Sequence, residues 1–93
     1  MKYLRVRWTH SNDAFPVLLY SEIDDARWES RKVEIFLDGR IGWADAHHEV
    51  GGSTLGQAEI PPLNEINAQD EFEGFEIGAE EFETAWLKAR NSN

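Results

Sequence analysis

Two adjacent histidines and two adjacent glycines stand within the stretch RIGWADAHHEVGGSTLG, residues 40–56. His47 and Glu49 have the His-x-Glu spacing of zinc deaminases, in which the histidine holds the metal and the glutamate transfers a proton. Those enzymes also require a pair of cysteines, and this sequence contains none. His47 and His48 point to opposite sides of an extended backbone, so they are poorly placed to share a metal. We therefore expect no metal ion and no other cofactor.

The glycines of GGSTLG, residues 51–56, do not match a phosphate-binding loop. Such a loop ends in Gly-Lys-Ser or Gly-Lys-Thr and connects a buried strand to a helix. Ser53 lies near the histidines in sequence, but no nucleophile elbow or oxyanion arrangement accompanies it. The glycines are more typical of a surface loop with positive φ angles. The sequence assigns no catalytic residue and favours a protein that is not an enzyme, and any role for His47, His48 and Glu49 is left open.

The charge of the chain is large and unevenly distributed. The net charge is −9 over 93 residues, which disfavours nucleic acid and anionic membranes as partners. Acidic and basic side chains balance over residues 1–40, whereas residues 41–87 contain eleven Asp or Glu and no Lys or Arg. The lack of cysteine and of any apolar run long enough to cross a bilayer predicts a soluble, cytoplasmic protein.

Carboxylates alternate with phenylalanines in the segment DEFEGFEI, residues 70–77. Acidic residues at 80, 81 and 83 complement the amino terminus of a helix, but those in the earlier segment have no such explanation. An acidic surface with exposed aromatics is suited to a basic groove on another protein, whereas buried phenylalanines would only attach the segment to the core. The candidate partner-binding residues are Asp70, Glu71, Phe72, Glu73, Phe75 and Glu76.

A second candidate surface lies on the amino-terminal strand. Tyr3, Arg5 and Arg7 alternate along residues 2–10, so they share one face of the expected strand. Tyr20 and Trp43 are candidates to join them, which would give an arginine-and-aromatic face for a small anionic ligand or a nucleotide. The same residues would equally form a second layer in which arginine stems cover aromatic rings. Both interpretations are open at this point.

The elements that must position these residues follow from hydrophobic periodicity and turn signals. The expected strands cover residues 2–10, 15–23 and 28–37, a hairpin partner after residue 39, and a short strand within 54–61. A short helix is expected within residues 62–69, and 70–77 is expected to be irregular. Residues 78–90 place Ala79, Phe82, Ala85, Trp86 and Ala89 at helical spacing, which predicts a carboxy-terminal helix.

The Asp38-Gly39 pair predicts a two-residue type I′ hairpin turn between two β-prone runs. The register that follows pairs Leu37 with Arg40, Ile35 with Gly42, and Val33 with Ala44. The face with the small residues would then receive the helix, and Trp43 would lie on the opposite face.

Strands followed by helices indicate an α+β fold. We expect one domain over residues 1–93, with a three- to five-stranded antiparallel sheet packed on one face by the carboxy-terminal helix. The sheet is expected within residues 2–60, and the acidic segment and helix within 61–91.

Several segments together resemble a family of small bacterial proteins with a single domain of about 90 residues and no established activity. The segments that carry the resemblance are YLRVRWTH, PVLLYSEIDDARWE, RKVEIFLDGRIGWAD, IPPLNEINAQDEF and EEFETAW. The resemblance implies a stand-alone bacterial protein and transfers no site residue. Small acidic bacterial proteins of this kind often neutralise secreted toxins.

These observations predict a protein-binding module, such as a toxin-neutralising immunity protein that occludes a basic site on its partner. Its own state would be a monomer or a homodimer. The alternative function is the binding of a small anionic ligand or nucleotide by the arginine-and-aromatic face.

Overall fold

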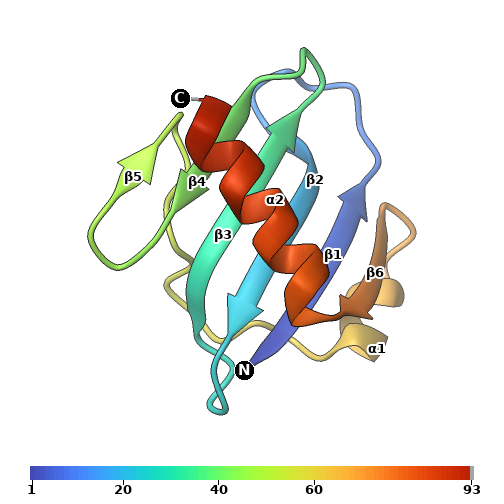
Figure 1. Cartoon of the computed structure of the whole chain (residues 1–93). Coiled ribbons are helices and arrows are strands. Elements are labelled where there is room, and N and C mark those ends of the chain that lie inside the picture. The colour runs from blue at the N-terminus through green and yellow to red at the C-terminus, as the bar shows by residue number, and fades with distance from the viewer. Residues whose placement is uncertain (93) are drawn as a thin grey trace.

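An antiparallel sheet of six strands forms the centre of the computed structural model, which describes residues 1–92 (Figure 1). Its strand order is β5-β4-β3-β2-β1-β6, and every neighbouring pair is antiparallel. The strands are β1 (Lys2–Trp8), β2 (Pro16–Ile23), β3 (Glu29–Phe36), β4 (Ile41–Ala44), β5 (Glu49–Val50) and β6 (Phe72–Ile77), and the helices are α1 (Leu63–Asn67) and α2 (Ala79–Ser92). The α+β class and the carboxy-terminal helix are confirmed, but the sheet has more strands than the three to five expected.

The sixth strand comes from the acidic segment that was expected to be irregular and to lie outside the sheet. β6 pairs with β1, so that Phe75 lies opposite Arg5 and Gly74 opposite Val6. Its carboxylates are tolerated because β6 is an edge strand, whose side chains reach solvent. Residues 54–61, expected to contain a short strand, form an irregular segment instead.

The hairpin between β3 and β4 differs by one residue from the expected register. Phe36 N–H donates to the Arg40 carbonyl, and Gly39 N–H donates to the Phe36 carbonyl, which leaves a three-residue loop at 37–39. Gly39 has a φ of +86°, as a glycine in a bulged hairpin loop does. Val33 therefore pairs with Trp43, and a one-residue shift moves every side chain of β4 to the other face.

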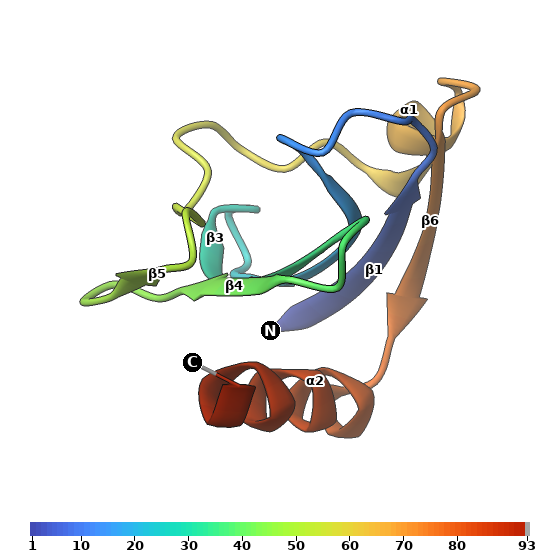
Figure 2. The same ribbon diagram turned by 90° about the horizontal axis from the view of Figure 1, so that it is seen from above.

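One face of the sheet packs against α2, which runs diagonally across it (Figures 1 and 2). Phe82, Trp86 and Ala89 form the buried stripe of the helix and contact Val33 and Trp43 of the sheet. The rings of Trp43 and Trp86 meet edge-on with centroids 5.2 Å apart. Burying one such side chain contributes about 1.5–3 kcal/mol, so this contact is a major part of the core.

The opposite face is covered by α1 and the long segment that precedes it (Figure 2). Leu4, Ile23 and Ile66 form a second buried cluster there. Arg27 holds the covering segment, because its Nε donates to the Ile60 carbonyl at 2.6 Å and its Nη2 donates to the Pro61 carbonyl at 2.8 Å. None of the helices within residues 1–92 is long and apolar enough to cross a membrane.

Candidate binding surfaces

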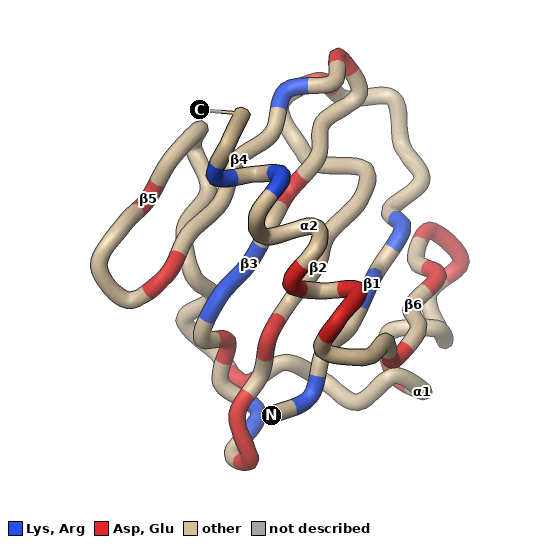
Figure 3. The backbone as a smooth tube through the Cα atoms, viewed as in Figure 1, with Lys and Arg blue, Asp and Glu red and all other residues tan. Residues whose placement is uncertain are grey.

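The acidic candidate residues lie at the β6 edge of the sheet (Figure 3). Asp70 and Glu71 occupy the turn before β6, and Glu73 and Glu76 lie on the strand. All four side chains are exposed. Within residues 1–92, no Lys, Arg or His nitrogen forms an ion pair with any of them.

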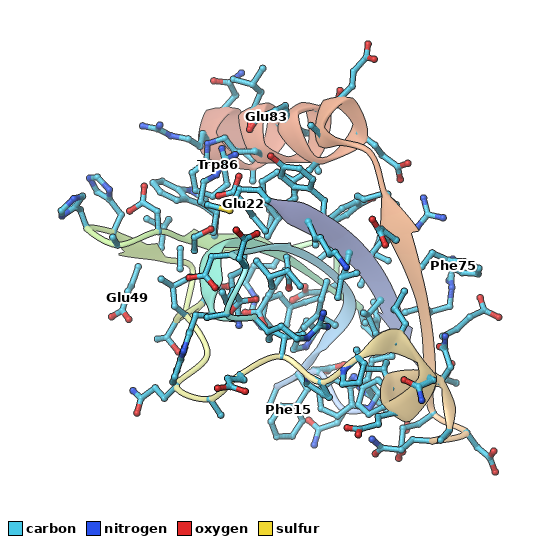
Figure 4. The ribbon with its side chains drawn as sticks, turned by 90° about the horizontal axis from the view of Figure 1, so that it is seen from below. Phe15, Glu22, Glu49, Phe75, Glu83 and Trp86 are labelled. Atoms are coloured by element: carbon cyan, nitrogen blue, oxygen red, sulfur yellow. The ribbon has the colours of Figure 1, made fainter. Side chains whose placement is uncertain are left out.

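The two phenylalanines of this segment have different environments. Phe72 is half-buried, and its ring lies 5.4 Å from the ring of Trp8, so it attaches β6 to the second core cluster. Phe75 is 48% exposed and points away from the core, as Figure 4 shows. Only Phe75 is therefore available as an aromatic contact for a partner.

The carboxylates on α2 are less available than the sequence indicates. Glu81 forms an ion pair with Arg5, and Glu83 forms one with Arg31, with Oε1 2.5 Å from Nη2. Arg5 also lies over the Phe75 ring, 5.7 Å from its centroid. Arginines from the charge-balanced half of the chain thus neutralise part of the acidic half, and the unneutralised carboxylates concentrate at β6.

The arginine-and-aromatic residues do not form one continuous surface. Tyr3 lies beneath α2, with its ring 5.2 Å from that of Phe82, and Trp43 is 6% exposed beneath Trp86. The remaining members lie beside the helix in a hollow of about 380 Å³. Its lining residues are Arg5, Arg7, Leu18, Tyr20, Glu73 and Phe75.

A network of hydrogen bonds joins the sheet to α2 around Glu22, which Figure 4 shows between the two layers. Glu22 accepts from Arg31 and from the hydroxyl of Ser30, and the Arg31 hydrogen bond holds the pKa of the Glu22 carboxyl below its usual value. The same interaction raises the pKa of Arg31. Burial, followed by the charge of Glu22, raises the pKa of Tyr3. The network is structural, since it couples β2 and β3 to the helix.

His47 and His48 are exposed in the β4–β5 turn, and Glu49 is exposed at the first position of β5. Nδ1 of His48 lies 3.0 Å from Oδ1 of Asp45, and the backbone N–H of His47 donates to the same oxygen at 2.9 Å. Although burial acts to raise the pKa of Asp45, these hydrogen bonds outweigh it and the pKa is lowered. Across residues 1–92, no group of three or more His, Asp or Glu side chains is arranged to hold a metal ion.

The glycine pair after β5 allows the loop at residues 51–53 to pack closely against β4. Gly51 and Gly52 have φ angles of +70° and +86°, which turn the chain back over β4. This turn places Ser53 against Gly42, where a Cβ on residue 42 would lie 2.3 Å from the serine Oγ. The Ser53 hydroxyl is buried and donates to Oε1 of Glu34 at 2.6 Å. Ser53 is therefore a structural residue.

Sequence reasoning missed a second polar network, on the face opposite α2. Glu29 accepts from the Ser21 hydroxyl at 2.7 Å and from the Gly56 backbone N–H at 2.8 Å. Nζ of Lys32 lies 3.1 Å from Oε1 of Glu29 and 3.8 Å from Oε2 of Glu34. The available signal was the alternation of Lys32 and Glu34 with Val33 and Ile35, which places both charges on one face. The burial of that face could not be read from the strand alone.

The fold and these surfaces define a small α+β domain with an acidic edge strand. The chain matches the family model described as a domain of unknown function (DUF6881) over residues 2–91, and it belongs to that family. No curated protein matches the chain, and no solved structure matches it.

Proposed function

We propose that this chain binds another protein through the acidic β6 edge, defined as Asp70, Glu71, Glu73, Phe75 and Glu76. The observation that carries the proposal is Phe75, an aromatic side chain that is 48% exposed on an edge strand that also presents the exposed Glu73 and Glu76. Exposed aromatics surrounded by polar groups are common anchors of protein interfaces. Phe72 is left out of this surface because it packs against Trp8.

The partner that fits this edge is a basic protein. Its Lys and Arg side chains would meet the carboxylates while an apolar pocket receives Phe75. Charge attraction of this kind accelerates association and weakens as salt increases. A toxin whose basic active site is covered by the β6 edge is the form of partner that we propose, with this chain acting as its immunity protein in the cytoplasm.

The test uses the tagged chain as bait in lysate from its source organism, at low and high salt. A captured protein is then purified, and its affinity is measured by calorimetry. We expect a basic protein that arrests growth when it is produced alone, with binding that weakens at high salt. Phe75→Ser should weaken binding at least tenfold. Phe15→Ser is the matched control, because Phe15 is also 48% exposed but lies outside the β6 edge.

The charge contribution is tested separately from the aromatic anchor. One variant combines Asp70→Asn, Glu71→Gln, Glu73→Gln and Glu76→Gln. A control variant neutralises four exposed carboxylates elsewhere, through Asp13→Asn, Asp25→Asn, Glu49→Gln and Glu59→Gln. Both variants change the net charge equally, so only a local effect separates them. Equal affinities for the two variants would refute the acidic β6 edge as the binding surface.

The hollow beside α2 supports a second candidate function, the binding of a small anion. Arg5, Arg7 and Tyr20 line about 380 Å³ of space there, although Glu73 also faces it. Pyrophosphate is a suitable probe, with amide NMR shifts of Arg7 and Tyr20 as the readout. Arg7→Gln should abolish saturable shifts, and Arg40→Gln, at an exposed arginine outside the hollow, should preserve them. Shifts spread over all exposed basic residues would contradict a specific anion site.

A further inference from the structure

The sheet face opposite α2 contains a second hollow, of about 240 Å³, between the strands and the segment that leads through α1 to β6. Most of its lining is apolar. The apolar lining residues are Leu4, Val6, Leu19, Ile60, Pro61, Ile66 and Phe72. Ser21, Glu29, Lys32 and Gln69 supply its polar side chains. A concave, mostly apolar hollow with a few converging polar groups is the usual form of a small-molecule site.

Glu29 and Lys32 differ in how many of their hydrogen-bonding positions have a partner within the protein. Glu29 is largely occupied, because Oε2 accepts from Ser21 while Oε1 accepts from Gly56 and forms an ion pair with Lys32. Lys32 carries three N–H donors. Within residues 1–92, Glu29 Oε1 is the one carboxylate oxygen within hydrogen-bond distance of its Nζ, since Glu34 lies at 3.8 Å. The ammonium group therefore has donors to offer to an oxygen atom in the hollow.

The lysine side chain is 13% exposed, so most of its stem is covered while its ammonium still reaches water. A ligand oxygen in the hollow would replace water as an acceptor of this ammonium, beside an apolar wall where a hydrogen bond is stronger than in bulk water. The carboxylate that pairs with Lys32, that of Glu29, is more deeply buried, with a side chain only 2% exposed. Glu29 holds the covering segment through the Gly56 backbone, and Lys32 balances the charges of Glu29 and Glu34 while keeping donors that a ligand could use.

We propose that this hollow binds a small neutral molecule that has an apolar tail and one carbonyl oxygen, with the oxygen accepting from Lys32. The charges around the hollow favour a neutral ligand over an anion or a cation. Glu29, Glu34 and Lys32 together carry one net negative charge, which opposes an anionic ligand. A cationic head group would be repelled by the ammonium of Lys32, which already forms an ion pair with Glu29. The volume suits a short tail and excludes a nucleotide.

Three probes with similar tails separate these cases: 2-heptanone, heptanoate and heptylamine. Each is titrated into the labelled protein, and methyl shifts of Leu4, Val6 and Ile66 are followed by NMR. We expect saturable shifts with 2-heptanone, and at least tenfold weaker binding of heptanoate and heptylamine. Methyl groups of Val33 and Ile35, on the α2 face, serve as internal controls and should not shift.

Two variants test the assigned roles. Lys32→Met removes the donor and keeps an apolar stem, and it should weaken 2-heptanone binding at least tenfold. Because this variant leaves two glutamates without their cation and can unfold, Leu19→Phe is a second test that reduces the hollow and retains the polar lining. Lys88→Met, on the far face, is the control. Preference for heptanoate or heptylamine, unchanged affinity in both test variants, or no saturable shift with any probe would overturn the proposal.

Discussion

Arg31 and Glu22 lie on neighbouring strands beneath α2, with Nη2 of the arginine 2.6 Å from Oε2 of the glutamate and Nε 2.9 Å from Oε1. The same guanidinium pairs with Glu83 of the helix. It also lies over the rings of Phe82 and Trp86, 4.9 Å and 5.0 Å from their centroids. A single arginine side chain thus connects two strands and the helix that packs on them.

Replacing Glu22 by Gln should make stability less dependent on pH. The pKa of Glu22 is lowered in the folded protein, so its carboxylate stabilises the fold above its ordinary pKa of 4.5, and this stabilisation is lost as pH falls through the lower folded pKa. Glu22→Gln should cost on the order of 3 kcal/mol at pH 7 and much less at pH 3. Urea unfolding at both pH values measures the difference.

The control for this prediction is Glu83→Gln, because the Glu83 side chain is 44% exposed. Its loss at pH 7 should be below about 1 kcal/mol. An equal cost of Glu22→Gln at the two pH values would show that packing, and not charge, explains the contribution of Glu22.

Replacing Trp86 by Ala should be among the most destabilising single changes. The side chain is buried between Trp43 and Phe82, and its removal leaves a cavity that the sheet cannot fill. We expect a loss of roughly 3–5 kcal/mol in the free energy of unfolding. Leu87→Ala is the neighbouring control, since Leu87 is 60% exposed. A loss below 1.5 kcal/mol, on the order of a single conservative core change, would contradict this packing.

Gly42→Ala should displace the loop after β5 even though Gly51 and Gly52 of that loop are unchanged. The new Cβ would lie 2.3 Å from Ser53 Oγ and 3.0 Å from the Val50 carbonyl oxygen, so the loop must move away from β4. The expected cost is about 1–3 kcal/mol, with faster amide exchange at Ser53. Gly78→Ala is the control, because a Cβ there meets nothing within 4 Å. Unchanged exchange at Ser53 would mean that the approach is looser than the structure indicates.

Asn67→Ala should expose the backbone of the edge strand. Oδ1 of Asn67 accepts from the Gly74 N–H at 2.6 Å, and Nδ2 donates to the Gly74 carbonyl at 3.0 Å, which blocks those groups from pairing with another chain. We expect a loss of about 1–3 kcal/mol and a new concentration-dependent dimer in sedimentation. Asn64→Ala, on the same helix, should have neither effect. Destabilisation without self-association would show that Asn67 only supports the fold.

The sequence by itself determined the features that depend on local periodicity. The stripe of Phe82, Trp86 and Ala89 predicted α2, and alternation within residues 2–10 predicted β1, because neighbouring residues alone set these patterns. The acidic segment at residues 70–76 was also visible, since charge is a property of composition. The resemblance to a family without known activity was confirmed over residues 2–91.

Only the tertiary structure decided which segments meet. β6 is a strand because β1, far away in sequence, supplies its hydrogen-bond partners, and no local pattern records that pairing. The hairpin register depends on one loop residue, which transferred Trp43 to the α2 face and made it core instead of a ligand contact. Lys32 and Glu29 became the polar lining of a hollow because a distant segment covers them, and burial of that kind depends on the whole fold.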